Sequence, residues 1–117
     1  MSISYGFDEV VASQEELLSL LKEKGKVTMM DECEVTMWAL FVNGVYHFYF
    51  ENDEDDQIFR GEFEFDVKNL EIVDKNLEKG WKVELQPKET AWRKMKRITN
   101  GPCQYQMSYG FEIEYIE

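Results

Sequence analysis

Residues 33–52 read CEVTMWALFVNGVYHFYFEN, and they contain the strongest structural signal in the chain. Two runs of alternating apolar and polar side chains flank the dipeptide Asn43-Gly44. Asn-Gly readily adopts the type I′ turn of a two-residue β-hairpin, because both central residues of that turn need a positive φ. A hairpin with this turn at its centre is predicted to pair Trp38 with Tyr49.

The alternation divides the hairpin's side chains between two faces. A one-residue slip would exchange these faces, so the apolar pattern determines the register. We predict that the more apolar face is the core: Val35, Met37, Ala39, Phe41, Tyr46, Phe48 and Phe50. The opposite face mixes aromatic, aliphatic and charged side chains: Trp38, Leu40, His47, Tyr49 and Glu51, among others.

Further strands follow the hairpin. Two long runs, 58–67 and 104–116, again alternate between apolar and acidic side chains. Two shorter runs, 69–73 and 81–86, are compatible with strands joined by a turn at Lys79-Gly80. The predicted strands are 58–67, 69–73, 81–86 and 104–116. Residues 88–98 fit either element, and the helical spacing of Trp92 and Met95 favours a short helix.

One helix is predicted before the hairpin, over residues 14–24. Ser13 and Glu16 have the spacing of a capping box, in which each side chain satisfies a free backbone N–H. Leucines then form an apolar stripe, and Gly25 is expected to end the helix in a left-handed conformation.

These elements predict an α+β fold in one domain, residues 1–117. We expect an antiparallel, meander-like β-sheet of about five to seven strands, with the N-terminal helix packed on the apolar face. Leu17, Leu20 and Leu21 would then contact Phe41, Phe48 and Phe63.

The composition supports a packed core and argues against a membrane or secreted location. Hydrophobic residues make up 44% of the chain, and no apolar run approaches the length of a membrane span. The first ten residues lack the basic and apolar regions of a signal peptide. Cys33 and Cys103 are too few for a disulfide scaffold. We therefore expect a cytoplasmic protein with reduced cysteines.

The net charge of −11 is concentrated in residues 51–66, which hold eight acidic residues and one base, Arg60. A surface of this kind repels nucleic acid and anionic membranes and attracts basic partners. A basic cluster between Lys88 and Arg97 is short, and we expect it to be a solvated side or to neutralise acidic residues rather than to bind nucleic acid.

The sequence predicts one partner-binding surface, in which aromatic anchors are surrounded by carboxylates. Two alternatives are that residues 81–98 cover this face as a second core, or that it is a dimer interface. The predicted surface consists of Trp38, Leu40, His47, Tyr49, Glu51, Asp53, Asp55, Asp56, Glu62, Glu64 and Asp66.

No motif for catalysis, metal binding or cofactor binding is present, and we expect a protein without a cofactor. The acidic loop 51–57 lacks the glycine and the closing glutamate of a calcium loop. The single histidine, His47, and two scattered cysteines do not form a zinc pattern. A cysteine–histidine dyad would need the two side chains to meet in the fold.

The leading hypothesis is a non-enzymatic acidic binding protein that inhibits or neutralises a partner protein with a basic site, of which a nucleic-acid-binding site is one example. Immunity proteins against toxins and phage anti-defence inhibitors have this general profile, which is an analogy of type alone. Carboxylates of residues 51–66 would replace phosphates, with Trp38 and Tyr49 as anchors. The alternatives are a small-molecule-binding domain or small enzyme with an aromatic pocket between sheet and helix, and a homodimeric structural protein.

Overall fold

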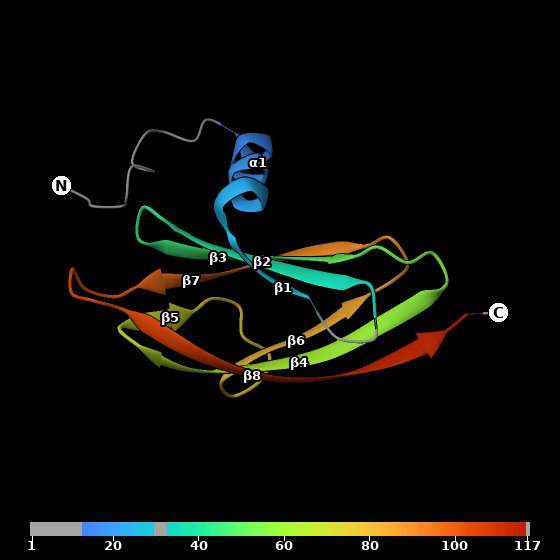
Figure 1. Ribbon diagram of the computed structural model, residues 1–117. Coiled ribbons are helices and arrows are strands. Elements are labelled where there is room, and N and C mark those ends of the chain that lie inside the picture. Colours follow the sequence, from blue (N-terminus) through green and yellow to red (C-terminus); the bar gives the residue numbers. More distant parts are fainter. Residues whose placement is uncertain (1–12, 30–32, 117) are drawn as a thin grey trace.

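The computed structural model describes residues 13–29 and 33–116 (Figure 1). These residues form one helix and eight strands in two antiparallel sheets. The helix is α1 (Gln14–Lys24), and the strands are β1 (Lys26–Met29), β2 (Val35–Val42), β3 (Val45–Asn52), β4 (Gln57–Lys68), β5 (Leu70–Ile72), β6 (Gly80–Leu85), β7 (Thr90–Arg97) and β8 (Gln104–Tyr115).

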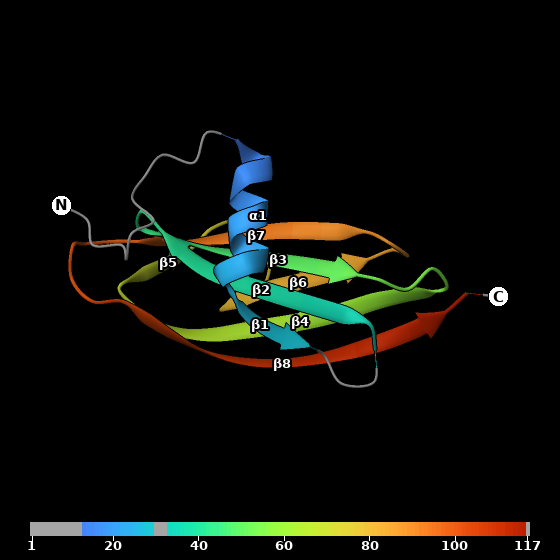
Figure 2. The same ribbon diagram turned by 45° about the horizontal axis from the view of Figure 1, so that its top comes forward.

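The two sheets lie face to face as the layers of a sandwich (Figures 1 and 2). Sheet A has the strand order β1-β2-β3-β7-β5, and sheet B has the order β6-β4-β8. The antiparallel pairing and the single helix confirm the coarse prediction for the described residues. The prediction of one meander-like sheet is wrong. β3 pairs with β7 and not with the next strand in the chain, and β4 and β6, which lie between them in the sequence, belong to sheet B.

The central hairpin has the predicted register. Trp38 lies opposite Tyr49, and Val42 lies opposite Val45 at the turn. Asn43 and Gly44 have φ angles of 50° and 84°. Both values are positive, as a type I′ turn requires, which explains why this dipeptide directs the hairpin.

Aromatic side chains from both layers fill the space between the sheets. Phe48 contacts Phe65 and Trp81, with ring centroids 5.6 and 5.3 Å apart, and the centroids of Phe50 and Phe63 are 4.9 Å apart. All five rings are buried. The predicted core face of the hairpin is therefore confirmed, but its covering element is sheet B.

The helix begins and ends at the predicted residues but packs on the opposite face of sheet A. The ammonium of Lys22 lies 5.0 Å from the ring centroid of Trp38 and 5.6 Å from that of Tyr49, both on the outer face. Figure 1 shows α1 on the side of sheet A away from sheet B. The predicted contacts of the helix with the Phe-rich core are wrong, because sheet B already buries that larger apolar face.

The two ends of the helix differ in how well they follow the prediction. The side chain of Ser13 accepts a hydrogen bond from the backbone N–H of Glu16 at 3.2 Å, as the cap predicts. Gly25 is not left-handed, since its φ is −73°. A Cβ at Gly25 would lie 2.4 Å from the carbonyl oxygen of Leu21, so close backbone approach explains this glycine.

Residues 88–98 contain strand β7 rather than a helix. This strand pairs with β3 on one side and with β5 on the other, so its backbone groups are satisfied within sheet A. Trp92 lies opposite Tyr49 in that register, and the segment extends the sheet instead of covering its outer face. Sheet pairing on both edges therefore outweighs the helical spacing of Trp92 and Met95.

The two short predicted strands are present but do not pair with each other. β5 belongs to sheet A and β6 to sheet B, and Gly80 is the first residue of β6 rather than part of a turn. Trp81 is fully buried and donates its indole N–H to the carbonyl of Val73 at 2.9 Å. The burial of Trp81 between the layers directs β6 to sheet B.

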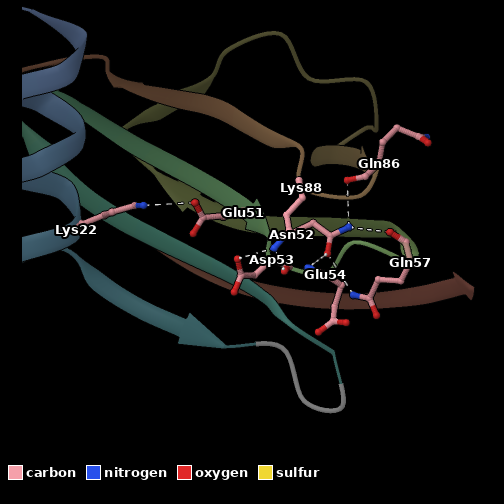
Figure 3. A network of polar contacts seen from close by, with 8 residues as sticks. All are labelled: Lys22, Glu51, Asn52, Asp53, Glu54, Gln57, Gln86 and Lys88. Atoms are coloured by element: carbon pink, nitrogen blue, oxygen red, sulfur yellow. Dashed lines mark hydrogen bonds and ion pairs between the residues drawn. The ribbon is translucent and has the colours of Figure 1, made fainter.

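A buried amide connects the two sheets at the end of β3. The Nδ2 of Asn52 donates to the carbonyl oxygens of Gln57 at 2.9 Å and Gln86 at 3.1 Å, and its Oδ1 accepts from the backbone N–H of Glu54 at 3.2 Å (Figure 3). Asn52 faces the core and is fully buried. A polar group there is stable only because each of its atoms has partners.

We predict that Asn52→Ala lowers the free energy of unfolding by about 2 kcal/mol, because it leaves buried carbonyl groups without donors. The melting temperature should fall by roughly 10 °C for a domain of this size. Asn76→Ala is the matched control, since Asn76 also bonds backbone groups, those of Lys82, but is exposed. Equal losses of stability in urea unfolding of the two variants would contradict the role of Asn52.

Candidate partner-binding surface

The structure separates the predicted partner-binding residues into three places. Trp38, Leu40, His47, Tyr49 and Glu51 are on the outer face of sheet A. Asp53, Asp55 and Asp56 are in the loop between β3 and β4. Glu62, Glu64 and Asp66 are on the outer face of sheet B. Because the two faces are on opposite sides of the sandwich, the predicted surface is not one continuous site.

The aromatic group on sheet A contacts the protein's own helix and β7. Tyr49 lies between Trp38 and Trp92, with centroid distances of 6.0 and 5.4 Å. Lys22 of α1 contacts the rings of Tyr49 and Trp38 and forms an ion pair with Glu51 at 3.4 Å. Tyr49 is buried. The predicted anchors therefore have a structural role beneath the helix.

His47 lies in the same group and is neutral at physiological pH. The indole N–H of Trp92 donates to its Nδ1 at 3.1 Å, so this nitrogen carries no proton. Burial, and then the nearby charge of Lys94, lower the pKa of His47 to about 4. Cys33 and Cys103 pack against the core on the other side of sheet A. No cysteine–histidine dyad therefore forms within the described residues.

The loop after β3 gathers acidic side chains at one end of the molecule. Carboxylate oxygens of Glu54, Asp55 and Asp56 lie within 4.8 Å of one another. Desolvation and the neighbouring carboxylates, Asp56 first, raise the pKa of Glu54. Lys88 stabilises the loop by donating to the carbonyl of Asp53 at 2.7 Å. Asp55 and Asp56 are exposed, and Glu54 is partly exposed.

The outer face of sheet B carries a larger acidic surface than predicted, and no described element lies over it (Figures 1 and 2). We call this surface the acidic face, and its charged residues are Arg60, Glu62, Glu64, Asp66, Lys68, Lys82, Glu84, Glu112 and Glu114. Six carboxylates thus face three cations. The added acidic residues come from β6 and β8, which flank β4.

Only part of the acidic face is neutralised within the described chain. Arg60 bridges Glu114 at 2.7 Å and Glu84 at 3.2 Å. Glu62, Glu64 and Glu112 form no ion pair with any described residue. Alternation in the sequence showed which side chains of 104–116 were acidic, but no signal placed that run beside β4.

Basic side chains of β7 do not neutralise the acidic face. Lys94 and Lys96 lie opposite His47 and Val45, and so belong to the outer face of sheet A. Lys96 lies opposite Glu71 on that face, and no ion pair joins a basic residue of β7 to the acidic face within the described residues.

A groove lies where the C-terminal end of α1 and the start of β1 approach β8. Its volume is about 500 Å³. Two lysines, Lys24 and Lys26, lie beside three aromatic residues, Phe41, Tyr46 and Tyr105. Burial raises the pKa of Tyr105, so its hydroxyl stays protonated at neutral pH. The groove thus lies between the C-terminal end of α1 and two aromatic residues of the hairpin's apolar face, Phe41 and Tyr46.

Comparisons with known proteins found no match to any protein-family model, to any curated protein or to any solved structure. In the described part of the chain, no helix has the length and apolar character needed to span a membrane. The arguments for function therefore depend on the surfaces described above.

We predict that stability falls as the pH decreases from about 6.5 to 4. The folded protein keeps His47 neutral down to a pKa of about 4, whereas the ordinary pKa of a histidine side chain is about 6.5. The unfolded chain therefore binds more protons in this window, and about 2 kcal/mol is lost after allowance for solvent screening.

His47→Gln retains an acceptor for Trp92 but cannot titrate, so its stability should fall less over the same window. Urea unfolding of both proteins at about pH 7 and pH 4.5 measures the difference, because their carboxylates titrate alike. Parallel losses in the two proteins would show that His47 does not titrate as described.

Proposed function

We propose that this protein is a non-enzymatic acidic binding protein that inhibits or neutralises a partner with a basic, nucleic-acid-binding site. The observation that carries this proposal is the acidic face, which has six exposed carboxylates on three adjacent strands. Glu84 and Glu114 pair with Arg60, and Asp66 pairs with Lys79, whereas Glu62, Glu64 and Glu112 form no ion pair with a described residue. The general class is that of immunity proteins and phage anti-defence inhibitors, by analogy of type.

The geometry of β4 supports recognition by several cationic side chains at once. Glu62, Glu64 and Asp66 are spaced two residues apart, or roughly 6.7 Å along an extended strand. Glu62 and Glu64 can therefore each meet a separate Lys or Arg, whereas Asp66 already pairs with Lys79 at 3.6 Å. Neighbouring strands at roughly 4.8 Å widen this row into a charged plane.

The proposed mechanism is steric and electrostatic. Carboxylates of the acidic face occupy the positions that phosphates take in the partner's cleft, and the sandwich behind them blocks access. Charge attraction raises the association rate, most strongly at low salt. Trp38 and Tyr49 are no longer proposed as direct anchors, because they contact α1.

We predict that the double variant Glu62→Lys/Glu64→Lys associates with its partner about tenfold more slowly at low salt. The partner is first isolated from the native host's lysate with tagged protein, eluted by a salt step and identified by mass spectrometry. Surface plasmon resonance then gives the association rates. The difference should shrink at about 0.5 M salt, where the Debye length is only a few ångströms.

Glu15→Lys/Glu23→Lys is the matched control, with the same change in net charge on the exposed side of α1. If both double variants were slowed equally, net charge rather than the acidic face would control association. A DNA duplex should compete with the wild-type protein for the partner. Failure of competition would exclude a nucleic-acid-binding cleft as the target.

A second candidate function, binding of a small anionic aromatic molecule, is favoured by the groove beside Lys24 and Lys26. Aromatic walls with a few convergent polar groups are typical of ligand sites. We predict that an aromatic carboxylate or a mononucleotide from a thermal-shift screen raises the melting temperature. Lys24→Gln/Lys26→Gln should abolish the shift, and an unchanged shift would place the ligand elsewhere.

A further inference from the structure

Strand β8 has a long free edge. It contains 12 residues and pairs through one edge with β4 over its whole length. No other described strand pairs with it. The backbone N–H and C=O groups on its second edge are therefore available to another strand.

The edge lacks the features by which proteins commonly block strand addition, such as proline or lysine. The sequence of β8, QYQMSYGFEIEY, contains neither. The other edge strands are shorter, with six residues in β6, four in β1 and three in β5. β8 is thus the best template for an added strand among the described elements.

The two faces of β8 define what such a strand would contain. On the inner side, Tyr109 is 40% exposed and Tyr115 is 66% exposed, so apolar surface remains beside the edge. On the outer side, Glu112 and Glu114 belong to the acidic face. An added strand would place alternate side chains next to these two rows.

Charge argues against a second copy of this chain as the occupant. Each copy carries a net charge of −11, and pairing of two β8 edges would join two acidic faces into one plane. The mutual repulsion of two chains with this net charge opposes such an association. A strand with cations on its outer side instead gains attraction at the same positions.

We propose that the free edge of β8 binds an extended segment of the partner in which Lys or Arg alternates with apolar residues. The segment adds a fourth strand to sheet B, and its apolar side chains lie beside Tyr109 and Phe111. Its cations lie beside Glu112, which forms no ion pair with a described residue, while Glu114 keeps its ion pair with Arg60. This inference rests on the proposed function and names the part of the partner that the acidic face recognises.

The test uses the full chain and a synthetic peptide in which Lys and Val alternate. The peptide has about ten residues, which is within the usual range of strand lengths. Calorimetry measures binding, and amide hydrogen exchange followed by NMR reports the position. We expect slower exchange at amides of residues 104–115. The same peptide N-methylated at alternate residues loses strand hydrogen bonds and should bind at least tenfold more weakly.

Gly110 offers a matched pair of variants on the same strand. It lies opposite Glu62, and a Cβ added there meets no atom within 4 Å, so substitution leaves the fold intact. Gly110→Lys should weaken peptide binding about five-fold, and Gly110→Glu should strengthen it. Equal affinities of the two variants would overturn the proposed position of the cations.

Other outcomes separate this inference from the proposed function. If the peptide does not bind, or the N-methylated peptide binds equally well, the edge proposal is wrong. The Glu62→Lys/Glu64→Lys experiment still tests the acidic face in that case. Protection of β8 amides in a dimer without peptide, detected by analytical ultracentrifugation, would replace the basic segment with a second copy of the chain.

Discussion

The buried amide of Asn52 is the interaction on which the relative position of the two sheets depends. The hairpin register turns this side chain inward at the end of β3, where it bonds backbone groups at the start of β4 and the end of β6. An amide in an apolar interior is costly unless it is fully bonded, so other displacements of the layers are disfavoured. No buried side-chain polar atom of the described residues lacks a partner.

The alignment of the two sheets determines which charged side chains each outer face presents to solvent. Sheet A turns Lys94 and Lys96 outward and holds the helix over its aromatic residues, while sheet B turns Glu62, Glu64 and Glu112 outward without cover. The chain therefore combines a structured aromatic face with an open acidic face. In the proposed function, this difference between the faces would orient a basic partner toward sheet B, where Glu62, Glu64 and Glu112 form no ion pair with a described residue.

The sequence predicted local structure better than long-range placement. Asn43-Gly44 and the alternation around it were enough for the hairpin, and Ser13 and Glu16 were enough for the start of the helix, since those interactions are local. The position of α1 depended on competition with Phe63, Phe65 and Trp81 for one apolar face, which no short pattern reports. For the same reason the sequence predicted only some of the residues of the acidic face. The acidic residues of β4 were identified, but their neighbours on β6 and β8 required the strand order.

The pairing of β4 with β8 also determines the order of folding during synthesis. Gln57 pairs with Tyr115, and Lys68 pairs with Gln104, so every contact joins residues far apart in the chain. Such non-local pairing is slow, because loop closure precedes the stabilising contacts. During synthesis we expect the local hairpin of β2 and β3 to form first, and β4 to remain with Phe59 and Phe63 incompletely covered until β8 is available for pairing. The nascent chain therefore passes through a stage in which aggregation competes with completion of sheet B.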